Sequence, residues 1–147
     1  MAEFKNILVT TDFSDSALGG VQSAKDLAAP LGAQLHLLYV ADLPLPSLTF
    51  SSEFHRQEIQ QEHLRRAQEE LSSYVEKHLA GLDVRPHLME GNAAEKIVVC
   101  ANEVKADLIV MATHGYGSVG KLVFGSTTLR VLHKSPCPVV AVRADSD

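Results

Sequence analysis

The sequence predicts an α/β fold in which an open, five-stranded parallel sheet carries helices on both faces. Short segments rich in β-branched and large aliphatic residues alternate with longer segments of helical periodicity along the 147 residues. The second short segment, 34–40, is apolar on both faces, as in a strand that helices cover from both sides. Strands that alternate with helices form parallel sheets with right-handed crossovers. We therefore expect the order β-α-β-α-β-α-β-α-β.

Each element of the first half has its own sequence signal. The first strand is apolar and partly β-branched, and a segment rich in N-cap residues follows it and leads into the first helix. Pro30 and Gly32 are expected to close that helix. A loop with two prolines, 41–52, follows the second strand. The second helix is long and polar, with a narrow apolar stripe, and Gly81 is expected to stop it.

The second half continues the alternation. Pro86 indicates that the third strand lies at a sheet edge. Gly91 turns the chain into the third helix, and the strand that follows it has the strongest strand signal of the chain. Ser126 is expected to cap a short fourth helix. The expected strands cover 4–10, 34–40, 84–88, 107–112 and 138–143, and the expected helices cover 17–31, 53–80, 93–104 and 126–132.

Composition restricts both the class of protein and its partners. Apolar residues make up 46% of the chain and charged residues 21%, which excludes a disordered chain, a coiled coil and a collagen-like repeat. Thirteen basic and 18 acidic residues give a net charge of −5, a poor match to nucleic acid or an anionic membrane. No apolar run approaches the roughly 20 residues that span a bilayer, and the first residues lack a signal-peptide pattern. We expect one cytoplasmic domain over 1–147.

Open parallel sheets bind ligands beyond the carboxyl ends of their strands, so the segments that follow the strands are the functional candidates. The segment 112–127 stands out because it contains four of the nine glycines. Glycine allows a close approach of the backbone to a ligand. Gly125, Ser126 and Thr127 lie at an expected helix start, where free N–H groups favour an anion. From composition alone, a phosphate cradle and a plain surface loop are about equal alternatives.

Two nucleotide-binding patterns nearly match this glycine-rich segment. Gly115, Gly117 and Gly120 fit the dinucleotide pattern Gly-x-Gly-x-x-Gly, but only the acidic C-terminal tail follows the next expected strand, and the rest of a dinucleotide fold is missing. Gly115 to Lys121 also resembles a P-loop. Leu122 then occupies the position where magnesium binding needs Ser or Thr. We therefore exclude a P-loop NTPase and regard an NAD(P)-linked protein as improbable.

Several motifs, taken together and in order, resemble the universal stress proteins of the type A-like, nucleotide-binding group. The signature of that group is Gly-x2-Gly-x9-Gly-Ser/Thr, and here Gly115 and Gly125-Ser126 match it while Ala112 takes the first position. The resemblance covers the whole chain, and only the glycine signature is specific by itself. The other matching segments are Thr11-Asp12-Phe13-Ser14, Leu37-Leu38-Tyr39-Val40, Asp107 to Met111 and Cys137-Pro138-Val139.

The resemblance implies an adenine nucleotide alpha hydrolase-like fold with strand order 3-2-1-4-5 that binds ATP, or ADP or AMP, with Mg²⁺ as a further ligand. By the same resemblance, Asp12 contacts the adenosine end, Val40 the adenine, and 125–127 the phosphates. It also implies a homodimer in which the last strands, 138–143, meet. The positions expected to bind the nucleotide are Thr10, Thr11, Asp12, Val40, Met111, Ala112, His114, Gly115, Gly125, Ser126 and Thr127.

Two departures from the family pattern leave alternatives open. Ala112 replaces a signature glycine, and Thr10 stands where many ATP-binding relatives have proline. We expect weaker or altered binding, unless Ala112 needs a positive φ. The bound nucleotide would act as a signal or switch in a stress response, since neither a Gly-x-Ser-x-Gly elbow nor paired catalytic carboxylates indicate an ordinary hydrolase. The alternatives are a nucleotide-free dimer that binds an unknown protein partner, and a slow ATPase.

Other chemically capable side chains have plain structural interpretations. Asp12 either contacts a ligand or helps to cap the first helix. His36 lies within a strand and is expected to be packed, whereas His114 is a possible nucleotide contact in a loop. His55 and neighbouring glutamates on the long helix have loose spacing for a metal site. Cys100 is expected to be a buried, unreactive thiol.

Overall fold

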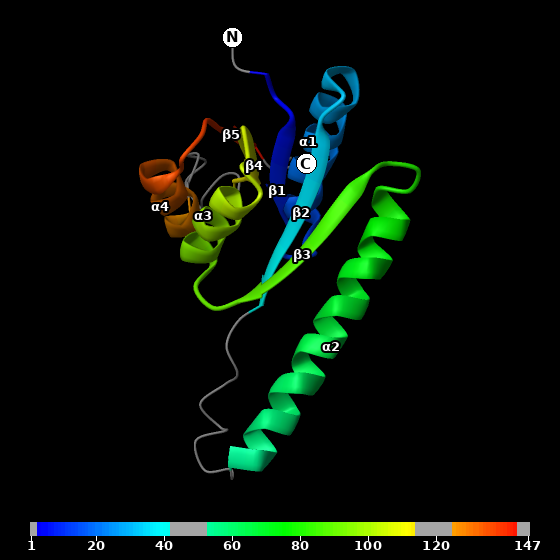
Figure 1. The fold of residues 1–147 in the computed structure, drawn as a ribbon, viewed down its shortest axis with the longest axis vertical. Coiled ribbons are helices and arrows are strands. Elements are labelled where there is room, and N and C mark those ends of the chain that lie inside the picture. Colours follow the sequence, from blue (N-terminus) through cyan, green and yellow to red (C-terminus); the bar gives the residue numbers. More distant parts are fainter. Residues whose placement is uncertain (1–2, 42–52, 114–124, 144–147) are drawn as a thin grey trace, which may run out of the picture.

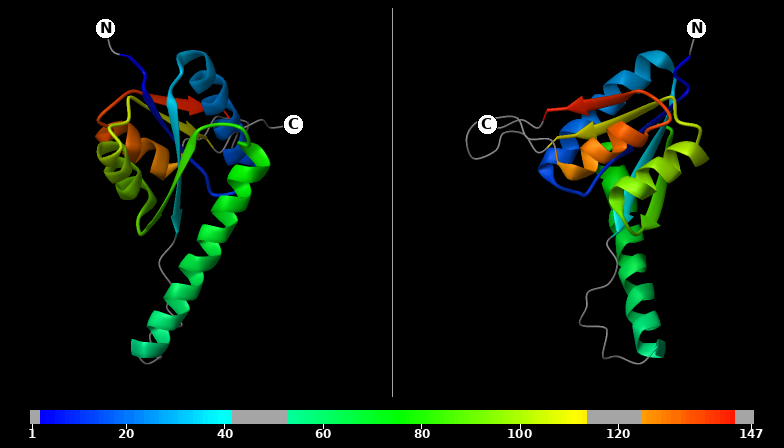
Figure 2. Two further views of the ribbon diagram at one scale, coloured as in Figure 1. Left: turned by 45° about the vertical axis from the view of Figure 1, so that its right-hand side comes forward. Right: turned by 90° about the vertical axis from the view of Figure 1, so that its left-hand side faces the viewer.

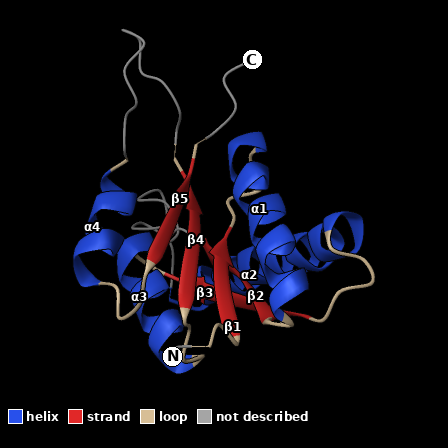
Figure 3. Cartoon of the chain, turned by 90° about the horizontal axis from the view of Figure 1, so that it is seen from above, coloured by secondary structure: helices blue, strands red, loops and turns tan. Residues whose placement is uncertain are grey.

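The computed structural model describes residues 3–41, 53–113 and 125–143, and its elements alternate as the sequence predicts. Five strands form one sheet in the order β3-β2-β1-β4-β5, and every neighbouring pair is parallel. Figure 1 shows the sheet and Figure 3 its view from above. The elements are β1 (Asn6–Thr10), α1 (Asp15–Leu31), β2 (Gln34–Ala41), α2 (Glu53–His78), β3 (Val84–Glu90), α3 (Ala93–Glu103), β4 (Leu108–Ala112), α4 (Ser126–Lys134) and β5 (Val139–Val142).

Helices cover both faces of the sheet, and each face has its own apolar core. In Figure 3, α1 and α2 lie on one side of the strands and α3 and α4 on the other. The first core contains Ile7 and Val110 from the strands with Val21 and Leu71 from α1 and α2. Leu8 and its neighbours on the opposite face pack against α3 and α4. Alternate strand residues therefore serve different cores, which confirms the prediction of a sheet buried on both faces.

The ends of α1 show where the sequence prediction was right and where it was wrong. Ser14 is the N-cap, and its side chain accepts a hydrogen bond from the Ala17 N–H. Gly32 closes the helix in the left-handed conformation, with φ 63°. Pro30 does not close the helix but lies inside its last turn. A proline there lacks the N–H for a hydrogen bond to the turn before, and the N–H groups of Gly32 and Ala33 donate to the carbonyls of Ala29 and Ala28.

Several element ends differ by one or two residues from those that the sequence predicts. β1 and β5 are shorter than 4–10 and 138–143, and α2 ends at His78, before residue 80. Gly81, with φ 81°, lies in the turn that follows α2. β3 lies at the sheet edge, as Pro86 indicates. The expected loop lies outside the described residues except for Ala41, which belongs to β2.

The long helix α2 packs on the sheet with only part of its length. Its buried side chains, Ala67, Leu71 and Tyr74, all belong to the C-terminal half. The N-terminal half extends past the carboxyl ends of the strands, as Figures 1 and 2 show. No helix among residues 3–41, 53–113 and 125–143 is both long and apolar enough to cross a membrane.

Candidate functional site

Side chains from the carboxyl ends of the central strands surround a pocket of about 180 Å³. β1 and β4 are neighbours at the point where the strand order changes direction, which is where open α/β sheets bind ligands. The first turn of α1, the start of α3 and the start of α4 complete the wall. Seven of the predicted site residues line this pocket, namely Thr10, Thr11, Asp12, Val40, Met111, Ala112 and Thr127.

Four other predicted site residues do not line the described pocket. Gly125 and Ser126 directly precede Thr127 at the start of α4. His114 and Gly115 lie outside the described residues. The described part of the pocket is smaller than the roughly 300–1,000 Å³ typical of small-molecule sites, so it is sized for one part of a nucleotide.

The start of α4 offers unpartnered N–H groups beside this pocket. Gly125, not Ser126 as predicted, is the N-cap, and no side chain among the described residues caps the helix. Gly125 has extended dihedrals, φ −64° and ψ 157°, so Ser126 already has helical geometry and cannot be the cap residue. The first N–H groups and the helix dipole therefore favour a negative charge here. Thr127 adds a hydroxyl group at the pocket wall.

Only one of the two carboxylate oxygens of Asp12 accepts hydrogen bonds within the turn. One of its oxygens, Oδ1, accepts a hydrogen bond from the Ser14 N–H at 2.9 Å and another from the Ser14 hydroxyl. Asp12 thus supports the N-cap of α1, as its structural interpretation predicted. Its Oδ2 has no hydrogen-bond partner among the described residues, and the side chain is exposed. This oxygen is therefore available to a ligand hydroxyl or a cation.

Ala112 fits the end of β4 without backbone strain. It is not among the described residues with positive φ, so the backbone conformation does not require glycine at this position. α1 approaches it closely at Gly20, where a Cβ atom would lie 3.2 Å from the Ala112 nitrogen and 3.4 Å from its Cβ. Gly20 is a residue that the sequence analysis missed. The helical periodicity gave no signal for it, because the close approach involves residues about ninety positions apart.

Thr113 and Ser16 also line the pocket and were not predicted. Thr113 is 2% exposed, and its hydroxyl has no hydrogen-bond partner within the described ranges. Its backbone N–H donates to the carbonyl of Val142 on the neighbouring strand. Thr113 directly adjoins the predicted Ala112, and a hydroxyl side chain at a strand exit was the available signal for it. Ser16 lies in the first turn of α1 and has no such signal.

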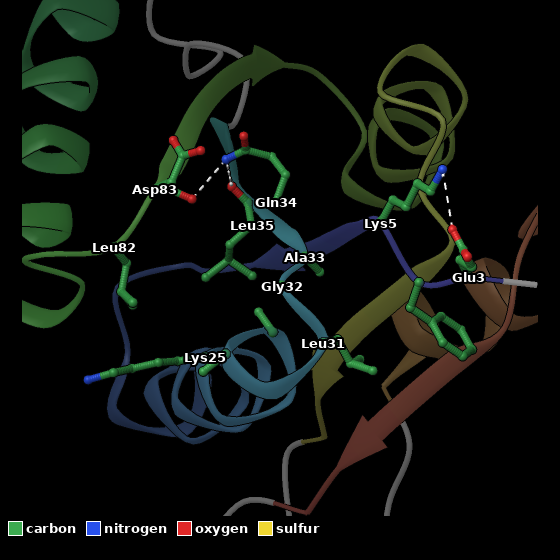
Figure 4. A pocket seen from close by; sticks show the side chains of 13 residues that line it. Glu3, Lys5, Lys25, Leu31, Gly32, Ala33, Gln34, Leu35, Leu82 and Asp83 are labelled. Atoms are coloured by element: carbon green, nitrogen blue, oxygen red, sulfur yellow. Dashed lines mark hydrogen bonds and ion pairs between the residues drawn. The ribbon is translucent and has the colours of Figure 1, made fainter.

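A larger pocket, of about 940 Å³, lies at the opposite end of the strands (Figure 4). Its wall combines the end of α1 with the starts of β1 and β2. Leu31 and Leu82 provide apolar surface, while Lys5 pairs with Glu3 at 3.3 Å. Charges of both signs surround this pocket, and it contains none of the predicted site residues. Because ligands of this fold class bind at the carboxyl ends, the smaller pocket remains the candidate site.

The histidines and cysteines of the described residues belong to the scaffold. His36 is 5% exposed, which confirms the expected packing, and it hydrogen-bonds to His87 and Asn6. Cys100 is completely buried, and burial raises the pKa of its thiol to about 11. Within the part of the chain that the structure describes, no three His, Cys, Asp or Glu side chains group as metal ligands, around His55 or elsewhere.

Comparisons with known proteins agree with this fold and place the chain in a family. A model of the universal stress protein family matches residues 3–143. A universal stress protein of Thermus aquaticus, encoded 3′ of a QAH/OAS sulfhydrylase, is 36% identical over 144 residues, which cover 95% of this chain and 99% of the relative.

Two solved structures extend the comparison. The protein MJ0577 of Methanocaldococcus jannaschii superimposes with a TM-score of 0.81 at 26% identity and covers 99% of this chain and 100% of its own. A universal stress protein of Archaeoglobus fulgidus in complex with dAMP superimposes with a TM-score of 0.64 at 25% identity, over 96% of this chain and 99% of its own. On the evidence of the family match and the shared fold, the chain is a member of the universal stress protein family.

Proposed function

We propose that this protein binds ATP or a related adenine nucleotide at the carboxyl ends of β1 and β4. The observation that carries the proposal is the convergence of seven predicted residues on one pocket beside the uncapped start of α4. A helix start without a side-chain cap favours phosphate. The relative of Archaeoglobus fulgidus that binds dAMP has the same fold, which supports an adenine nucleotide as the ligand.

Within this proposal, each part of the pocket has a role. Val40 and Met111 provide apolar surface for the base, and Asp12 provides an oxygen for the adenosine end. The first turn of α4, 125–127, holds the phosphates together with residues His114 and Gly115. The unpartnered Asp12 Oδ2 also fits a Mg²⁺ ion, because hard cations prefer carboxylate oxygen. The nucleotide acts as a signal or conformational switch in a stress response.

Nucleotide released from the purified protein provides the first test. We expect near-stoichiometric ATP, ADP or AMP when the protein is denatured and the supernatant is separated by anion exchange with mass detection. Gly125→Val should empty the site, because its side chain would lie among the N–H groups that hold phosphate. Its φ of −64° accommodates valine without backbone strain, so the fold should persist, with a modest loss of thermal stability because valine is a poorer N-cap residue than glycine.

Absence of nucleotide, followed by no ATP binding in calorimetry with Mg²⁺, would contradict the proposal. It would favour the alternative of a family member that works as a protein-interaction dimer. Ala112→Gly then tests whether the methyl group at the signature position causes the loss. ATP turnover well above background that Asp12→Asn abolishes would instead favour a slow ATPase.

We also infer a cytoplasmic homodimer in which the β5 strands of two copies meet. β5 is at the sheet edge and contains Val139, Val140 and Val142, and an apolar edge strand needs a partner or a cover. On the neighbouring α4, Leu129 and Leu132 are each 45% exposed. The thiols of Cys100 and Cys137 are free, which is consistent with a reducing compartment.

Light scattering of the purified protein tests the dimer. Ala141→Lys should produce monomers at concentrations where the wild type is dimeric, because it places charge at the exposed position of the contact strand. Val98→Lys is a suitable control, since Val98 faces a groove between α3 and α4, away from β5. A monomeric wild type, or equal dissociation of both variants, would contradict the inferred interface.

A further inference from the structure

The turn between β1 and α1 contains a residue in an unusual backbone conformation. Phe13 has φ 67°, in the left-handed region that bulky residues rarely occupy. Such conformations persist only where the surrounding structure holds them, and they are concentrated at functional sites. Asp12 and Ser14, on either side of Phe13, both line the candidate pocket.

Aromatic contacts hold Phe13 on the side of the sheet away from the pocket. Its ring centroid is 4.5 Å from that of Tyr39 on β2 and 5.4 Å from that of Tyr74 on α2, the latter edge to face. Phe13 packs against the core that α1 and α2 cover, whereas the pocket wall includes Leu38 and Met111 of the opposite core. The turn therefore connects the candidate site with α2.

Hydrogen bonds fix the rest of the turn relative to Phe13. The Phe13 N–H donates to the Thr11 hydroxyl at 3.0 Å, and the Thr11 N–H donates to the Leu38 carbonyl at 3.0 Å. The next N–H along the chain, that of Ser14, donates to Asp12. A change of φ at Phe13 would reorient the peptide groups on which the Asp12 carboxylate and the N-cap depend.

We propose that Phe13 is a positioning residue. Its contact with Tyr74 sets the conformation of the Thr11–Ser14 turn, and the conformation of this turn sets the affinity for nucleotide. The second half of this inference rests on the proposed function. Because coupling between two parts of a molecule is reciprocal, nucleotide in the pocket should also stabilise the C-terminal half of α2. The helix that extends past the sheet would thus respond to occupancy of the site.

Substitutions at Phe13 separate backbone conformation from packing. Glycine adopts positive φ without strain but lacks the ring, whereas alanine lacks the ring and disfavours positive φ. ATP affinity, measured by calorimetry, should therefore decrease in the order wild type, Phe13→Gly, Phe13→Ala. A residue that only fills space would give equal losses, or a larger loss for glycine, and either result would overturn the positioning role.

Substitutions at Tyr74 test the contact with α2. Tyr74→Ala should lower ATP affinity by about fivefold or more, a value at the low end of couplings between separate sites. Tyr74→Phe keeps the ring and removes the hydroxyl, which lies beside the Thr11 side chain without an ordinary hydrogen bond. Retained affinity would assign the coupling to the ring contact with Phe13, and a loss as large as that of Tyr74→Ala would overturn that assignment. Leu79→Ala is the matched control, because Leu79 is also buried in the same core, at 1% exposed against 9% for Tyr74, and takes no part in the aromatic contacts. Equal loss of affinity in Tyr74→Ala and Leu79→Ala would overturn the coupling.

Hydrogen exchange without nucleotide keeps this test separate from the proposed function. The Ala17 N–H donates to the Ser14 side chain and reports on the cap. Its exchange should become faster in Tyr74→Ala than in Leu79→Ala, even if the wild type binds no nucleotide. In that case the proposed function fails and the structural coupling stands. Equal exchange in the two variants would refute the coupling whether or not ATP binds.

Discussion

Gly20→Val is expected to destabilise the protein by about 1–3 kcal/mol, the usual effect of overpacking a buried site, and to weaken nucleotide binding. Gly20 is buried where α1 crosses the end of β4, and a Cβ atom there would lie 3.2 Å from the backbone nitrogen of Ala112. Backbone atoms of a central strand cannot move aside as a flexible side chain can. The helix must therefore shift away from β4, and Ala112 is part of the pocket wall.

The neighbouring glycine provides a matched control for this prediction. At Gly19 an added Cβ atom would meet no atom within 4 Å. Gly19→Val makes the same chemical change one residue earlier in the same helix, and valine is slightly more favourable than glycine in helices. Urea unfolding should show a loss for Gly20→Val and none for Gly19→Val, and ATP calorimetry should follow the same pattern. Equal stability and affinity of the two variants would show that the close approach is unimportant.

Local patterns predicted the order of elements because helices cover both faces of the sheet and bury its central strands. Strand 34–40 is an example: Leu37 and Leu38 are both completely buried, in different cores. Such a segment has little choice of structure once helices flank it. The element ends were less predictable. Pro30 fits within a last helical turn as well as after it, and the sequence alone does not distinguish these positions.

The sequence predicted those site residues that the strand order alone brings together. Asp12, Val40 and Met111 end or follow three strands that lie side by side, so parallel pairing brings them together. Gly20 and Phe13 could not be found in this way. Their importance depends on neighbours distant in the sequence, Ala112 for one and Tyr74 for the other. The family motif contains Phe13, but the motif does not indicate a positive φ.

A hydrogen-bonded pair of histidines, the buried His36 and the half-buried His87, makes stability sensitive to mild acid. The Nδ1 of His36 lies 2.9 Å from the Nε2 of His87, and the Nε2 of His36 lies 3.1 Å from Asn6 Oδ1. An amide oxygen only accepts hydrogen bonds, so His36 carries its proton on Nε2 and accepts the His87 N–H through Nδ1. The network joins β1, β2 and β3 when both rings are neutral. A second proton on His36, at Nδ1, would place the N–H donors of the two rings face to face.

The surroundings of the pair favour the neutral rings. Burial lowers the pKa of both histidines below the ordinary value of 6.5, and Arg85 on β3 acts in the same direction. His87 also lowers the pKa of His36. Asp83, before β3, and Glu103, at the end of α3, oppose these effects at His36 and His87 respectively. The folded protein therefore binds fewer protons than the unfolded chain once the pH falls below 6.5.

The free energy of unfolding is accordingly expected to decrease as the pH is lowered from about 7.5 to about 5.5, a range in which most carboxylates stay ionised. The stabilisation is complete above the ordinary histidine pKa and is lost as the pH drops through it toward the lowered values. His87→Gln should flatten this dependence, because a glutamine N–H can donate to His36 without titrating. His133→Gln, at an exposed position on α4, should leave it unchanged. Urea unfolding at several pH values measures the slopes, and identical slopes for wild type and His87→Gln would exclude the histidine pair as their cause.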